Sequence, residues 1–149
     1  VDEMKSHGGL AHPPIFEPSV GRYAQGMIVE VPLPLYALPS APKLADLHAA
    51  LAKAYEGERF VQVASLEEAA SMSTLAPEGL NGTNMMKLFV FGSDKYQQAR
   101  LVALLDNLGK GASGAAVQNL NLMLGLEEGA GLVERFDWST APSLNAAAS

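Results

Sequence analysis

Three glycines near the end of the chain, Gly109, Gly111 and Gly114 in LDNLGKGASGAAVQ, have the spacing Gly-x-Gly-x-x-Gly. Between a strand and a helix, this spacing is typical of the turn that binds the pyrophosphate of a dinucleotide. Such a unit also needs a second parallel strand, about 20 residues later, that ends in an acidic residue for the ribose. The predicted helix is followed instead by a polar tail. The sequence therefore argues against a dinucleotide-binding fingerprint.

Two interpretations of the glycines remain. A glycine-rich turn that opens a helix exposes backbone N–H groups at the positive end of the helix dipole, and Lys110 adds a charge, so an anion or the polar edge of a cofactor could bind there. The glycines could instead serve only a tight turn and close helix packing, which the spacing alone favours. Gln118, Asn119 and Asn121 lie in an otherwise apolar helix, so each needs a partner, either a cofactor amide or a backbone carbonyl.

The sequence contains no cysteine, which excludes disulfides, thiolate metal sites and thiol catalysis by these residues. We predict no metal site. The net charge of −6 argues against a nucleic-acid partner, because phosphate binding needs clustered basic residues. No apolar run approaches the roughly 18 residues of a membrane span, and no leader pattern opens the chain. We therefore expect a cytoplasmic protein that binds small molecules or proteins, with no membrane partner.

The chain of 149 residues, 48% of them apolar, is long enough for one core, so we expect one domain over residues 1–132 and a disordered tail over 133–149. Residues 1–26 are rich in glycine and proline and predict a structured loop. The alternating segment GMIVEVPLPLYAL predicts a strand whose prolines require the edge of a sheet.

The remaining elements follow from local patterns. A helix is predicted from near Pro42 to Gly57, a strand in RFVQVA, and a short helix in SLEEAASM with Ser65 as its N-cap. MMKLFVFGSD and QQARLVALLDN predict two strands joined by a hairpin turn at GSDK. After the glycines comes a helix whose apolar residues predict a buried face: Ala116, Val117, Leu120, Met123 and Leu124. This order predicts an α+β fold, with an antiparallel or mixed sheet and helices on one face.

Three blocks of sequence carry a resemblance to a known family: HPPIFEPSVGRYAQGMIVEVPL, LNGTNMMKLFVF and LLDNLGKGASGAAVQNLNLMLGL. Together they resemble the C-terminal part of the N-acetyl-gamma-glutamyl-phosphate reductases, relatives of aspartate-semialdehyde dehydrogenase. The likeness runs in order from about Asp2 to Leu132. It implies a substrate-binding and dimerisation domain of semialdehyde-dehydrogenase type, whose last helix returns to pack beside an N-terminal Rossmann domain that is not in this sequence.

The resemblance also implies the chemistry. In the family, a cysteine thiolate displaces phosphate from an acyl phosphate, NADPH reduces the thioester to the semialdehyde, and a histidine carries the proton. This chain lacks the cysteine, and VDEM at its start matches the end of the segment that holds the histidine, so that histidine is expected upstream. His48 is better explained as a packing or surface residue and His12 as a structural loop residue, while His7 lies with His12 in the segment that is expected to enter the site region. No catalytic residue is therefore assigned, and the chain alone is expected to be inactive.

Binding residues are carried over on the matched blocks. Arg22, Gln25 and Asn84 are candidates for the substrate, since an acyl phosphate with a carboxylate needs cationic and amide donors. For Arg22 a surface ion pair is an equal alternative, and Asn81 in the same NGTN segment is favoured as a turn residue. The resemblance places the glycine turn near the nicotinamide of NADP, with five candidates: Asn107, Gly109, Lys110, Gly111 and Gln118.

The resemblance therefore predicts one part of an NADP-dependent reductase of arginine biosynthesis, homo-oligomeric through its sheet. The alternative is a free-standing, non-catalytic module that binds a small molecule or serves oligomerisation. A polar surface where the Rossmann domain should pack would favour the alternative. The apolar start of the last helix, at Ala115, Ala116 and Val117, favours the reductase instead.

Overall fold

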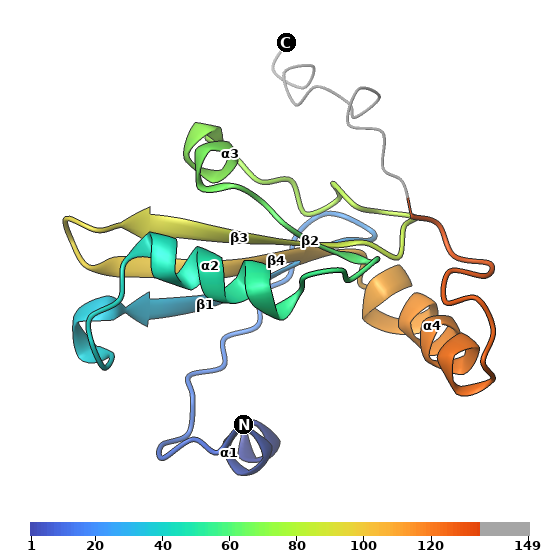
Figure 1. The fold of residues 1–149 in the computed structure, drawn as a ribbon, viewed down its shortest axis with the longest axis horizontal. Helices are drawn as coiled ribbons and strands as arrows, with labels where there is room; N and C mark the ends of the chain where they lie inside the picture. Colours follow the sequence, from blue (N-terminus) through green and yellow to red (C-terminus); the bar gives the residue numbers. More distant parts are fainter. Residues whose placement is uncertain (135–149) are drawn as a thin grey trace.

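Four strands form one mixed sheet, in the order β1-β4-β3-β2, in the computed structural model, which describes residues 1–134 (Figure 1). The strands are β1 (Met27–Pro34), β2 (Val61–Val63), β3 (Met86–Ser93) and β4 (Gln98–Leu105). β4 is antiparallel to both β1 and β3, whereas β2 runs parallel to β3. The expected α+β class with a mixed sheet is confirmed.

Strand β1 lies at an edge of the sheet, as its prolines require. Pro32 and Pro34 pair with Arg100 and Gln98 at the end of the β1–β4 ladder. Proline cannot donate a ladder hydrogen bond, so it is tolerated only where one side of the strand has no neighbour. The alternation in β1 leaves Val29 and Val31 46% and 49% exposed in this chain.

The helices are α1 (Asp2–Gly8), α2 (Leu44–Ala54), α3 (Leu66–Ser71) and α4 (Gly114–Met123). Helix α3 begins where the capping signal predicts, because the Ser65 hydroxyl accepts a hydrogen bond of 3.1 Å from the backbone N–H of Glu68. It contributes Ala69 to a core that also contains Phe89, Val102 and Leu104. This core therefore includes side chains of both central strands, β3 and β4.

Helix α1 corrects the prediction that residues 1–26 are entirely loop. Asp2 and Glu3 lie in its first turn, where negative charge favours a helix, and Gly9 ends it with φ of 63°. The glycine that was taken as a loop signal is therefore a helix C-cap. None of the residues of α1 is buried.

Helix α4 also differs from its prediction. Its apolar residues were expected to be buried, yet Val117, Leu120, Met123 and Leu124 are 39%, 53%, 83% and 63% exposed. The described part of the chain places no layer over this face of α4. The helix projects from the end of β4, beyond the body of the sheet (Figure 1).

The disordered tail predicted for residues 133–149 falls outside the described residues from 135 onward. Val133 and Glu134 are described, and both make contacts. The Val133 carbonyl accepts a hydrogen bond from the backbone N–H of Asn84 at 2.8 Å, and the Glu134 carboxylate pairs with Arg59.

Candidate functional site

Asp106, the first residue after β4, lies at the centre of a polar site at one end of the sheet. Its side chain is 1% exposed. One oxygen, Oδ1, accepts a hydrogen bond from the backbone N–H of Leu108 at 2.8 Å. The other, Oδ2, accepts from the N–H of Gly82 at 2.8 Å and from Nε2 of Gln25 at 2.5 Å. A single carboxylate thus ties together three segments that are far apart in the sequence.

These hydrogen bonds decide the charge of Asp106. Burial alone would raise the pKa of the carboxyl group, because it removes the charged form from water. The backbone N–H groups of Gly82, Gly109 and Leu108, followed by the Gln25 amide, oppose burial and bring the pKa below its ordinary value. Asp106 is therefore an anion at neutral pH, fully engaged with donors from its own chain.

A cavity of about 290 Å³ opens beside this carboxylate. Its lining comes from four segments: Gln25, the loop 82–84, the turn from Asp106 to Gly114, and residues 131–133. The strand register explains why they meet, since Met27 and Met86 both lie opposite Leu105. The starts of β1 and β3 and the end of β4 therefore share one edge of the sheet, to the right in Figure 1.

A chain of side-chain contacts begins at Asn84, which lines the cavity. Nδ2 of Asn84 donates to Oε1 of Gln118 at 2.9 Å, and Nζ of Lys110 donates to the same oxygen at 2.6 Å. Nε2 of Gln118 in turn donates to a carboxylate oxygen of Glu128 at 2.6 Å. Burial lowers the pKa of Lys110, while the charges of Glu128 and Glu58 partly offset that effect. Helix α4 is thereby joined to the loop before β3.

Two buried oxygen atoms near this chain of contacts have no hydrogen-bond partner within residues 1–134. They are Oδ1 of Asn84, a residue that is 2% exposed, and Oδ1 of Asn81. Buried acceptors without a donor are costly and uncommon. Of these two residues only Asn84 lines the cavity, so its oxygen is the one whose position would suit a ligand's hydrogen-bond donor.

The glycines of the Gly-x-Gly-x-x-Gly stretch have a packing role in this structure. A Cβ at Gly109 would lie 2.6 Å from the Thr83 carbonyl oxygen, and a Cβ at Gly114 would lie 2.3 Å from Oδ1 of Asn84. Only glycine allows the turn and the helix to approach the loop before β3 so closely. Residues 109–113 form a π-helical turn, Gly109–Ser113, that leads directly into α4.

The structure brings some of the predicted binding residues together and separates others. Three of the predicted residues, Gln25, Asn84 and Gly109, line the cavity. The other five lie outside its lining. Gln118 contacts Asn84 and Lys110, and Oδ1 of Asn107 accepts from the N–H of Gly26 at 2.8 Å. Arg22 and Gly111 are exposed.

Sequence reasoning missed Asp106, which organises the site. An ionisable residue directly after the most apolar strand, in LVALLDN, was the available signal. The amides of the last helix were recognised as needing partners, and two have them. Gln118 contacts Asn84, Lys110 and Glu128, and Asn121 donates to the backbone carbonyls of residues 128 and 130. The third, Asn119, is exposed.

Other sites are less developed. A second hollow of about 480 Å³ lies at the hairpin end of β3 and β4, and Arg100 is the only charged side chain in its lining. Among residues 1–134, no group of three or more histidine, aspartate or glutamate side chains is placed to hold a metal ion. None of the helices described is long and apolar enough to cross a membrane.

Comparison with known proteins identifies the family. The sequence model of the semialdehyde dehydrogenase dimerisation domain matches residues 1–107, more than two thirds of the chain. The chain belongs to this family. It is 53% identical over 135 residues to N-acetyl-gamma-glutamyl-phosphate reductase 2 of a Nostoc species, a match that covers 89% of the chain and 42% of the relative. It is 58% identical over 125 residues to N-acetyl-gamma-glutamyl-phosphate reductase of Brucella ovis, which covers 84% of the chain and 40% of the relative.

The matched region is only part of each relative. The chain spans about two fifths of the length of these reductases. The match to the dimerisation-domain model ends at residue 107, so the glycine turn, α4 and residues 124–134 lie beyond the matched region. The cavity is lined by residues from both sides of that point.

Proposed function

We propose that this chain forms the substrate-binding and dimerisation part of an NADP-dependent reductase that converts N-acetyl-gamma-glutamyl phosphate to N-acetylglutamate semialdehyde. The observation that carries the proposal is the cavity at the end of β4, where Gln25, Asn84 and Gly109 meet. The identity to reductases of this name supports it. The thiolate must come from residues outside this sequence, because the chain contains no cysteine.

The donors and acceptors of the cavity suit the nicotinamide end of NADP better than its phosphates. The carboxylate of Asp106 lies in the lining, and its negative charge disfavours a nearby phosphate. The partnerless Oδ1 of Asn84 instead calls for an N–H donor, such as a carboxamide carries. When bound, the cofactor supplies hydride. The Asn84, Gln118 and Gly109 segments would orient the carboxamide and keep water from that face.

For the substrate, we assign two residues at the start of β1. Gln25 is held by Asp106, so its amide is fixed in orientation at the rim of the cavity. Arg22 is exposed three residues earlier, and its guanidinium is suited to a carboxylate or phosphate arriving from solvent. The predicted roles are orientation by Gln25 and charge neutralisation by Arg22.

Two apolar surfaces support the proposed partners. Val29 and Val31 on β1 are about half exposed, and they belong to the part of the chain that matches a dimerisation domain. We assign this face to contact with a second copy. The exposed apolar residues Leu120 and Met123 of α4 and Leu124 at its C-cap lie beyond the region that matches the dimerisation domain, and we assign them to contact with the Rossmann domain of the complete enzyme. An apolar surface there counts against the free-standing module.

The test uses the full-length protein in the reverse direction, with N-acetylglutamate semialdehyde, phosphate and NADP as reactants and NADPH absorbance as the readout. Activity is expected for the full-length protein and none for the 149-residue chain alone. Asn84→Ala should raise the KM for NADP roughly tenfold, as expected when a buried acceptor loses its ligand donor. Asn119→Ala is the matched control, since Asn119 is exposed on the same helix that Asn84 contacts.

Two results would refute this proposal. Turnover by the 149-residue chain alone would contradict a mechanism that needs an external cysteine. A full-length protein that shows no activity with these three reactants, while a thermal melt shows that it is folded, would exclude the assigned reaction.

A further inference from the structure

The eleven residues after α4, residues 124–134, fold back toward the sheet and complete the cavity. We call them the return segment. Gly125 and Gly131 have φ of 66° and 76°, so the segment turns sharply at both glycines. Gly131, Leu132 and Val133 then line the cavity. Because the Val133 carbonyl accepts the backbone N–H of Asn84, this lining is attached directly to the loop before β3.

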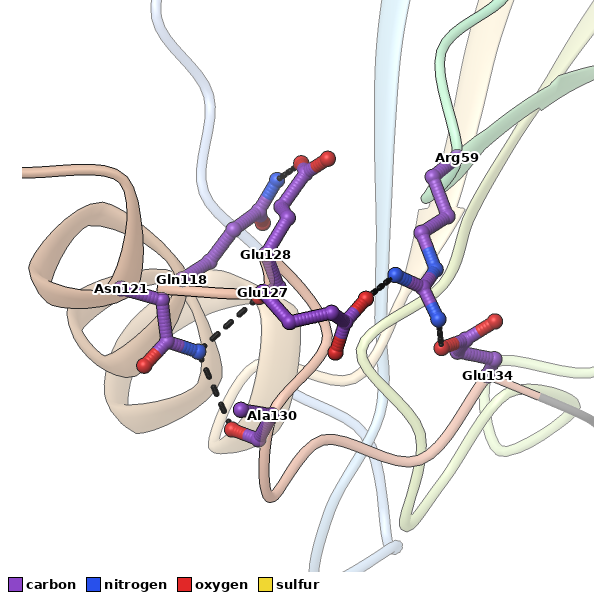
Figure 2. Close-up of polar contacts among 7 residues, drawn as sticks. All are labelled: Arg59, Gln118, Asn121, Glu127, Glu128, Ala130 and Glu134. Atoms are coloured by element: carbon purple, nitrogen blue, oxygen red, sulfur yellow. Dashed lines mark hydrogen bonds and ion pairs between the residues drawn. The ribbon is translucent and has the colours of Figure 1, made fainter. Parts of the chain in front are cut away.

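Asn121 holds the first half of the return segment from the helix side. It is 5% exposed, and its Nδ2 donates to the carbonyl oxygens of Glu128 and Ala130 at 2.9 and 3.0 Å (Figure 2). The backbone carbonyl of Asn121 accepts a hydrogen bond from the N–H of Leu126 at 2.9 Å. These bonds shape the segment on α4, but they do not attach it to the sheet.

Arg59, just before β2, makes the attachment from the sheet side. Its guanidinium pairs with the carboxylates of Glu127 and Glu134, one on each side of the segment's second turn (Figure 2). Gly129 lies against the same group, since a Cβ there would be 2.7 Å from Cζ of Arg59. A planar group with five donors can hold two carboxylates at once, which a lysine cannot do with the same geometry.

We propose that Arg59 is a positioning residue that fixes the return segment over the site and thereby sets one wall of the cavity. Arg59 is absent from the lining of the cavity, so it acts only through Glu127 and Glu134. Without Arg59, the carboxylates of Glu127 and Glu134 would lose their common cation. The hydrogen bond between the Asn84 N–H and the Val133 carbonyl would then open more often. The consequence for cofactor binding rests on the proposed function, whereas the movement of the return segment does not.

The experiment compares Arg59→Gln with Arg100→Gln in the full-length protein. Arg100 pairs with Glu30 at 3.3 Å on β1 and β4, away from the return segment, so it is a control for loss of a partly exposed ion pair. Hydrogen exchange is measured on peptides that contain the Asn84 amide. Arg59 is 37% exposed in its side chain, so loss of its two ion pairs should speed this exchange roughly threefold to tenfold.

Two further readouts separate positioning from general destabilisation. Arg59→Gln should raise the KM for NADPH about as much as it speeds exchange, with kcat and the melting temperature close to those of the parent. Arg59→Lys should give an intermediate exchange rate, because lysine can pair with only one carboxylate well. Raising the salt concentration should speed exchange in the parent and leave Arg59→Gln unchanged.

Equal exchange at Asn84 in the parent, Arg59→Gln and Arg100→Gln would overturn the proposal. Faster exchange in Arg59→Gln alone supports it, whatever happens to the kinetics. If exchange rises while the KM for NADPH stays constant, the return segment is positioned by Arg59, and the assignment of this cavity to the cofactor is what fails.

Discussion

Replacing Asp106 with asparagine tests whether one buried carboxylate holds the candidate site together. The substitution keeps the shape of the side chain and removes its charge. Besides the backbone N–H of Gly109, which also lowers its pKa, three donors point at the carboxylate: the N–H of Leu108 on one oxygen, and the N–H of Gly82 and the Gln25 amide on the other. An asparagine has only one side-chain oxygen. If that oxygen faces Gly82 and Gln25, the NH₂ group must face the N–H of Leu108.

The expected cost follows from this arrangement. The N–H of Leu108 would face a donor and lose its partner, which costs roughly 1–3 kcal/mol in a buried site. The two remaining hydrogen bonds would lose their charged acceptor, at a further ~0.5–1 kcal/mol in total. We therefore expect Asp106→Asn to lower the free energy of unfolding by ~1.5–4 kcal/mol.

Urea denaturation followed by circular dichroism measures this difference, with an unchanged m-value as the sign that the same structure unfolds. Asp2→Asn is the matched control, because Asp2 is exposed in the first turn of α1, and it should change stability by less than ~0.5 kcal/mol. A loss below ~0.5 kcal/mol for Asp106→Asn as well would mean that the three hydrogen bonds do not hold the site, and the reasoning would be refuted.

Three further predictions concern pH, packing and association. The pKa of Asp106 is lower in the folded chain than its unfolded value of about 3.9. The charged carboxylate therefore stabilises the fold fully above the unfolded pKa, and this stabilisation is lost as the pH falls through the folded pKa. Urea titrations from pH 5 to pH 2 should therefore show a shallower acid loss for Asp106→Asn than for the parent; parallel curves would contradict this. Gly114→Ala should cost about 1–3 kcal/mol in thermal melts, since its Cβ would lie 2.3 Å from Oδ1 of Asn84, whereas Gly8→Ala has no contact closer than 3.6 Å. Val31→Glu, on the half-exposed face of β1, should weaken self-association at least ~tenfold in sedimentation equilibrium without lowering the melting temperature; an unchanged association constant would remove this face from the interface.

The elements of the fold that local sequence predicts are those with strong local signals. Alternation in β1, β3 and β4 and the Ser65 cap each depend on residues within a few positions of one another. The hairpin was predicted, but its turn was placed two residues early, at GSDK, because Gly92 and Ser93 belong to β3 and the turn spans residues 94–97. The prediction for α1 was wrong because Gly8 and Gly9 were taken as loop residues, whereas a glycine with positive φ is also the usual end of a helix.

The site was harder to predict because its contacts are long-range. Asp106 binds Gly82 and Gln25, which are 24 and 81 residues away in the chain, and no periodicity connects them. The same holds for Arg59 and Glu134, which are 75 residues apart. The residues that the family resemblance supplied, such as Asn84 and Gln118, do lie beside the cavity, but their roles in binding stay predictions.

The antiparallel pairing of β3 and β4 also places the candidate site at one end of the two strands and the hairpin that joins them at the other. Met86 and Leu105 mark the site end of this strand pair, and Ser93 pairs with Gln98 at the other end. Lys95 and Tyr96 at the hairpin tip are exposed, a full strand length from Asp106. An affinity tag inserted between Lys95 and Tyr96 would therefore report on the protein without touching the cavity.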